Sequence, residues 1–169
     1  MIDKIQYVSR KGSVALIGLG MNTSQFDDVE NGLLVHNEGP VGVSWVSDVK
    51  GKIDFAIADG CLYAYPTPDM LKIIIICSND EIVEPNNAVV LNEGGTRFCQ
   101  LMIPERLSTS EGRRLPRGGL TGFMQCGWFD DPNYMSFECY IADSDFIERR
   151  LLRMSDFQFD KQYFYTWRL

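Results

Sequence analysis

Short runs of alternating hydrophobic and polar residues recur along the chain, a pattern typical of β-strands with one buried face. The clearest example covers residues 120–142, where two flanks rich in aromatic and bulky residues enclose Asp130-Asp131-Pro132-Asn133. Proline presets φ in such a turn, and aspartate and asparagine bond their own nearby backbone. The pattern therefore predicts an antiparallel hairpin whose turn lies at Pro132-Asn133.

The hydrophobic positions of this hairpin also predict its register. Pairing about the turn places three pairs of side chains on one face: Trp128 with Phe137, Cys126 with Cys139, and Met124 with Ile141. Because side chains alternate across a strand, the other face carries the more polar set of Gln125, Gly127, Glu138 and Tyr140. We expect the first face to belong to the core. Cys126 and Cys139 would then be within disulfide reach, although two reduced core thiols are the preferred interpretation.

Other hydrophobic runs predict a succession of short strands joined by tight turns. We expect strands at residues 2–8, 14–19, 33–36, 41–46, 53–58, 61–65, 70–77, 88–91 and 96–103, with one or two more within 157–169. Asp59-Gly60 is a two-residue hairpin signal that would pair 53–58 with 61–65. The run at 70–77 is continuously apolar and rich in isoleucine, which predicts a strand covered on both faces.

Two segments have the pattern of a helix. Residues 145–154 would place apolar side chains on one side and arginines on the other, with Asp143 or Ser144 as the cap. Residues 23–31 begin with a capping Thr or Ser followed by acidic residues, which fits a short helix. A tight hairpin turn at Asn31-Gly32 is the alternative for that segment, and we favour the helix.

These elements predict a mainly β (α+β) fold of antiparallel sheets built from consecutive hairpins, as a sandwich or a half-open barrel. The length of 169 residues suits one domain, and no repeat or low-complexity linker divides it, so we expect a single domain over 1–169. No stretch approaches the roughly 18 uninterrupted apolar residues of a membrane span. The five cysteines are odd in number and dispersed, which favours reduced thiols and a cytoplasmic location.

The chain is acidic, with a net charge of −7 that is unevenly spread. Residues 1–95 hold 13 acidic and 6 basic side chains, whereas residues 96–169 hold 10 of each. Binding to nucleic acid or to an anionic membrane needs clustered positive charge, so the composition argues against both. It favours a protein partner with a basic surface, while simple solubility explains the same charge equally well.

Candidate chemistry is sparse in this sequence. His36 is the only histidine, so a Ser-His-Asp or Cys-His site would have to use it. The cysteines lie in apolar runs that disfavour thiolates, and their spacing fits no zinc site. The acidic cluster of Asp143, Asp145 and Glu148 fits helix capping better than cation binding. We therefore predict no catalytic residue, no metal and no cofactor, and we favour a non-enzymatic role.

Candidate partner-binding residues form three groups. The loop at residues 104–119 carries arginines, which are enriched at protein interfaces, although a solvated segment would look the same. Aromatic residues near the C-terminal end would anchor a partner from a sheet edge, although core packing is the alternative. The predicted set comprises Arg106, Arg113, Arg114 and Arg117 of the loop, the acidic residues Asp27, Asp28, Glu30, Asp80 and Glu81, and the aromatic residues Tyr163, Tyr165 and Trp167.

The sequence thus favours a small acidic cytosolic protein-binding domain, of the inhibitor or immunity (toxin-neutralising) type, that occludes a partner's site. Two alternatives stay open. One is a structural subunit of a larger assembly, joined through an exposed strand edge. The other is a carboxylate-dependent hydrolase with two acidic side chains in a cleft of the β-scaffold.

Overall fold

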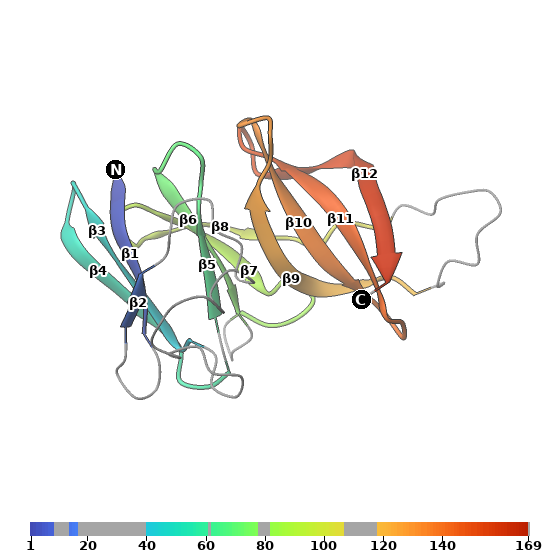
Figure 1. Cartoon of the computed structure of the whole chain (residues 1–169), viewed down its shortest axis with the longest axis horizontal. Helices are drawn as coiled ribbons and strands as arrows, with labels where there is room; N and C mark the ends of the chain where they lie inside the picture. The colour runs from blue at the N-terminus through green and yellow to red at the C-terminus, as the bar shows by residue number, and fades with distance from the viewer. Residues whose placement is uncertain (9–13, 17–39, 61, 78–81, 107–117, 169) are drawn as a thin grey trace.

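The computed structural model describes residues 1–8, 14–16, 40–60, 62–77, 82–106 and 118–168, without the side chains of 14–16 and 162–168. The described residues form twelve strands and no helix, and the strands build three four-stranded antiparallel sheets (Figure 1). In this part of the chain, no helix is long and apolar enough to cross a membrane.

The three sheets follow one another along the chain. The N-terminal sheet, of order β2-β1-β3-β4, contains β1 (Ile2–Val8), β2 (Val14–Leu16), β3 (Gly42–Ser47) and β4 (Gly51–Ala56). The middle sheet, of order β5-β6-β7-β8, contains β5 (Leu62–Pro66), β6 (Lys72–Cys77), β7 (Ala88–Asn92) and β8 (Arg97–Leu101). The C-terminal sheet, of order β12-β11-β10-β9, contains β9 (Leu120–Trp128), β10 (Tyr134–Ile141), β11 (Phe146–Arg153) and β12 (Gln158–Arg168).

The middle sheet lies between the other two and shares a hydrophobic core with each (Figure 1). Alternate residues of β6 point to opposite sides: Ile73 and Ile75 join the core of the N-terminal sheet, and Ile74 and Ile76 join that of the C-terminal sheet. Burial of each isoleucine contributes about 1.5–3 kcal/mol. The prediction that residues 70–77 form a strand covered on both faces is therefore confirmed, because β6 is buried on both faces.

The prediction of a mainly β fold with antiparallel sheets is likewise confirmed in the described residues. The architecture has one layer more than the expected sandwich, because the middle sheet packs into a hydrophobic core on each of its two faces. The final segment forms the single strand β12 at an edge of the C-terminal sheet. The expected elements at 23–31 and 33–36 lie outside the described residues.

The predicted C-terminal helix at 145–154 is wrong, because this segment forms β11 between β10 and β12. Glu148 and Arg150 are 1% and 3% exposed, and they lie on one face of the strand. Because two charged residues occupy this buried face, the sequence of the segment does not show the hydrophobic period of two that is typical of a strand. Ser144 does act as a cap, but in the turn before β11, where its Oγ accepts a hydrogen bond of 3.2 Å from the Phe146 N–H.

The hairpin of β9 and β10 forms where predicted, but the predicted register is wrong, by two residues near the turn and by three and then four residues farther along the strands. The observed partners are Trp128 with Met135, Cys126 with Phe137, Cys139 with Phe123, and Ile141 with Leu120. A shift of two keeps side chains on their predicted faces. The residues buried on the core face accordingly include Cys126, Phe137, Cys139 and Ile141.

A wide turn and two bulges account for the register difference. Asp131 accepts hydrogen bonds from the N–H of Asn133 through Oδ1 (2.9 Å) and from the N–H of Tyr134 through its carbonyl (3.0 Å), so the turn exceeds two residues. Met124 and Thr121 are extra residues of β9 at the two places where the pairing shifts. Trp128, predicted in the core, is 40% exposed at the end of β9.

The predicted hairpin at Asp59-Gly60 is also wrong, because β4 and β5 belong to different sheets. The chain crosses here from the edge of the N-terminal sheet to the edge of the middle sheet. β5 instead pairs with β6, with Ala64 opposite Ile75. The continuous apolar face of β6 offers β5 a neighbour that is fully buried, which an exposed strand such as β4 does not.

Candidate partner-binding surface

The described cysteines are poorly suited to nucleophilic chemistry. Cys77, Cys126 and Cys139 are buried free thiols, and Cys99 is half-buried and free. Burial raises the pKa of the Cys126, Cys139 and Cys99 thiols above the usual range, so all three stay protonated at neutral pH. His36 lies outside the described residues. Among the residues that are described, no three histidine, cysteine or carboxylate side chains are grouped so that they could hold a metal ion.

Most of the predicted partner-binding residues lie outside the described ranges: Arg113, Arg114, Arg117, Asp27, Asp28, Glu30, Asp80 and Glu81. The three aromatic residues lie on β12. In the backbone pairing of that strand with β11, Tyr163 is opposite Arg150, Tyr165 is opposite Arg149, and Trp167 is opposite Ile147. Their role in binding a partner stays a prediction.

Arg106 is described, and it belongs to a buried ion cluster on the inner face of β11. Its Nε lies 3.6 Å from Oε2 of Glu148, whose Oε1 lies 3.3 Å from Nη1 of Arg150. Arg150 also donates to the carbonyl oxygens of Glu105 (2.7 Å) and Asp160 (2.9 Å). The side chain of Arg106 is 12% exposed, so it packs largely against the protein, and its role in binding a partner stays a prediction.

The same arginine joins the two ends of the predicted contact loop. Nη1 of Arg106 donates a hydrogen bond of 2.7 Å to the carbonyl of Gly118. Residues 106 and 118 are thereby fixed against β11, and they flank the segment that carries Arg113, Arg114 and Arg117. Sequence reasoning missed this anchoring role, because Glu148 and Arg150 were placed on a helix.

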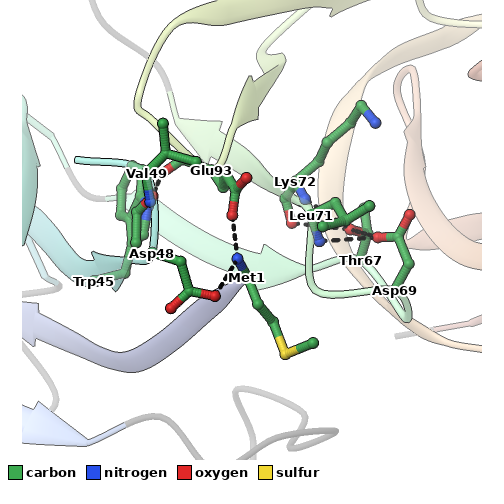
Figure 2. Close-up of polar contacts among 10 residues, drawn as sticks. Met1, Trp45, Asp48, Val49, Thr67, Asp69, Leu71, Lys72 and Glu93 are labelled. Atoms are coloured by element: carbon green, nitrogen blue, oxygen red, sulfur yellow. Dashed lines mark hydrogen bonds and ion pairs between the residues drawn. The ribbon is translucent and has the colours of Figure 1, made fainter. Parts of the chain in front are cut away.

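A second ionic group forms around the amine of Met1, between the N-terminal and middle sheets (Figure 2). The amine of Met1 donates to the carboxylates of Asp48 (2.9 Å) and Glu93. Trp45 donates from Nε1 to the carbonyl of Glu93 at 2.7 Å. These contacts hold β1 and the β3–β4 turn against the β7–β8 turn, so this group fixes two sheets together.

The same view shows the turn between β5 and β6, which Thr67 and Asp69 order (Figure 2). Beside that turn, the ammonium of Lys72 lies 5.0 Å from the ring centroid of Phe98. A cation over an aromatic face at this distance is stabilising. Phe98 is 52% exposed and its ring lies 5.4 Å from that of Phe157, so this contact covers the seam between the middle and C-terminal sheets.

The outer face of the C-terminal sheet carries a polar group that spans three adjacent strands. Gln125 on β9 donates from Nε2 to Oε2 of Glu138 on β10 at 2.5 Å, and Arg149 on β11 donates from Nη2 to Oε1 at 2.6 Å. The three residues are direct cross-strand neighbours. Both oxygens of Glu138 are thus held in place, which makes this face rigid and polar.

A pocket of about 280 Å³ opens beside these residues. It is lined by residues 125–130 of β9 and the following turn, by Ser136 and Glu138 of β10, and by Arg149 of β11. Gly127, which has no side chain, and Ser136, whose side chain is small, are register partners and both line the pocket. Sequence reasoning identified the polar face but no pocket, because the pocket depends on the true register and on β11.

The chain has a counterpart of known structure. A chain in the solved structure of Tne2 in complex with Tni2 is similar in fold. The TM-score is 0.62 at 15% sequence identity, and the similarity covers 98% of this chain and 100% of that chain. All three sheets are therefore included in the similarity to the Tne2–Tni2 chain, which shows the fold. No protein-family model matches the sequence, and no curated protein matches it.

Proposed function

We propose that this protein is an immunity-type binding protein of the cytoplasm, which neutralises a partner protein by covering the partner's functional site. The observation that carries the proposal is the fold, which the chain shares over 98% of its length with a chain solved in a complex between Tne2 and Tni2. An occluding protein needs a rigid, complementary surface and no chemistry of its own. The inert thiols and the ordered sheets described above suit that role.

The outer face of the C-terminal sheet is our candidate for the contact surface. Arg149 and Tyr140, which is 39% exposed, lie on this face, and both residue types are enriched in the energetic centres of interfaces. Glu138 and Gln125 add a fixed polar centre. The backbone of β12 extends the same sheet and carries the predicted contact residues Tyr165 and Trp167.

The charge of the chain supports a partner with a basic surface. The net charge is −7, and residues 1–95 carry all of that excess. Among the described acidic residues, the side chains of Asp48 and Asp54 are 78% and 65% exposed. Complementary charge raises association rates between proteins and disfavours wrong partners. The acidic residues Asp80 and Glu81, predicted for partner binding, would act in the same way.

The test is co-expression with the protein encoded by the adjacent gene. If the proposal is right, that neighbour inhibits cell growth when expressed alone, and growth is restored when this chain is expressed with it. The two purified proteins should elute together in size-exclusion chromatography and have the mass of a stoichiometric complex by light scattering.

A matched control separates binding from a general effect of expression. The control chain carries Glu148→Ala, which removes the buried counter-charge of Arg150 and is expected to destabilise the fold by about 3–5 kcal/mol. It should restore growth less well than the wild-type chain at the same expression level. A neighbour without toxicity, or equal rescue by a control shown to be less folded, would contradict the proposed function.

A further inference from the structure

We propose that the pocket on the outer face of the C-terminal sheet receives an arginine side chain that projects from the partner. This rests on the proposed function for the existence of a partner, and it names the chemistry of one contact. The pocket has a volume of about 280 Å³, which accommodates a single long side chain. The register partners Gly127 and Ser136 line it, together with Glu138.

The charges that line the pocket favour a cation. The charged residues that line the pocket are two acids, Glu138 and Asp130, and one base, Arg149. The lining therefore keeps one negative charge beyond the pair of Glu138 and Arg149. The chain as a whole has a net charge of −7, so the long-range field attracts a basic side chain to the same surface.

The geometry of Glu138 suits a guanidinium in particular. Each carboxylate oxygen can accept two hydrogen bonds. Oε2 accepts one from Gln125 and Oε1 accepts one from Arg149, so a second acceptor position remains at each oxygen. A guanidinium carries parallel N–H groups that can reach two acceptors at once, whereas an ammonium acts as a point charge.

The side chain of Glu138 is already ordered in the free protein. Its side chain is 10% exposed, and neighbours on two strands fix it, so little side-chain entropy is lost on binding. Asp130, in the β9–β10 turn, is exposed and also lines the pocket. An entering guanidinium would therefore lie between a buried acceptor and an exposed one.

The experiment uses N-acetyl-L-arginine amide as the probe, and it requires no knowledge of the partner. The full chain, labelled with ¹⁵N, is titrated with this compound while amide signals are followed by NMR. We expect saturable shifts, with a dissociation constant in the millimolar range, at the backbone of Gly127, Ser136 and Glu138 and at the side-chain amide of Gln125. N-acetyl-L-citrulline amide, which has the same shape without the charge, should cause no saturable shift.

Two tryptophan variants of β10 provide the matched pair. Ser136→Trp fills the pocket and should abolish the shifts, whereas Tyr134→Trp, on the same strand face outside the pocket lining, should keep them. Glu138→Gln should weaken binding roughly tenfold or more, with a thermal unfolding scan to show that each variant is folded.

Each result decides the inference. Absence of saturable shifts in the wild type, an equal response to the citrulline compound, or unchanged shifts in folded Ser136→Trp would overturn it. Failure of the proposed function is separate, because it is measured by the growth rescue and the complex described above. Arginine binding without rescue would leave a cation-binding pocket whose protein partner is of another class.

Discussion

The side-chain amide of Asn87 binds the main chain of Phe123 through two hydrogen bonds. Oδ1 accepts from the Phe123 N–H at 2.7 Å, and Nδ2 donates to the Phe123 carbonyl at 2.9 Å. Asn87 precedes β7 of the middle sheet, and Phe123 lies in β9 of the C-terminal sheet. One buried side chain therefore supplies an edge of β9 with the pairing that a neighbouring strand would give.

Replacing Asn87 by alanine should lower the free energy of unfolding by about 2–4 kcal/mol. The substitution leaves the N–H and the carbonyl of Phe123 buried without a partner, and each such group costs about 1–3 kcal/mol. Urea unfolding followed by circular dichroism measures the change. Asn92→Ala removes an exposed 3.2 Å hydrogen bond to Thr96 and should change stability far less. Equal changes in the free energy of unfolding for the two substitutions would show that the buried hydrogen bonds of Asn87 stabilise the fold no more than an exposed one.

The buried ion cluster on β11 should be equally sensitive to the loss of one member. Glu148→Ala leaves the guanidinium of Arg150, 3% exposed, without its carboxylate, and unpaired buried charges cost about 3–5 kcal/mol. Chemical denaturation is the measurement. The matched control is Asp54→Ala, which breaks an exposed ion pair with Lys52 and should have little effect. A folded Glu148→Ala variant of unchanged stability would contradict a stabilising role for the cluster.

The hydrophobic period and the burial of the strands could be predicted from the sequence, whereas contacts between residues far apart in the sequence could not. The isoleucines of β6 and the two faces of the β9–β10 hairpin followed from local pattern alone. The prediction of a helix at 145–154 failed because Glu148 and Arg150, a charged pair on a core face, resemble the polar side of a helix in the sequence. The pocket required the register of Gly127 and Ser136, which depends on a turn wider than the two residues that the sequence predicted.

The free energy of unfolding should fall at alkaline pH, because the protein contains buried thiols. Burial raises the pKa of Cys126 and Cys139 above the ordinary value of 9.0. In the unfolded chain both thiols lose a proton near pH 9, whereas in the folded chain they keep it, so stability falls as pH rises through that range. The free energy of unfolding should be flat from about pH 7 to 8 and fall by roughly 1 kcal/mol per thiol by about pH 10.

A double variant isolates the contribution of these thiols. Cys126→Ala with Cys139→Ala should be less stable at pH 7, because it loses packing, but its stability should decline less steeply with pH. Tyr7, whose pKa is raised mainly by burial, adds a decline that both proteins share. The same slope in the double variant and the wild type would show that the two thiols do not cause the effect.

Partner association should depend on the acidic residues of the first half of the chain. We expect Asp80→Asn with Glu81→Gln to slow association with the protein encoded by the adjacent gene several-fold at low ionic strength, because charge complementarity acts mainly on the association rate. The difference should vanish at about 500 mM NaCl, where exposed charges are screened. Glu105→Gln with Asp145→Asn makes the same change of charge in the half with no net charge, and it should slow association less. Stopped-flow fluorescence gives the rates, and equal slowing by both pairs would indicate that net charge, and not the predicted contact residues, steers the partner.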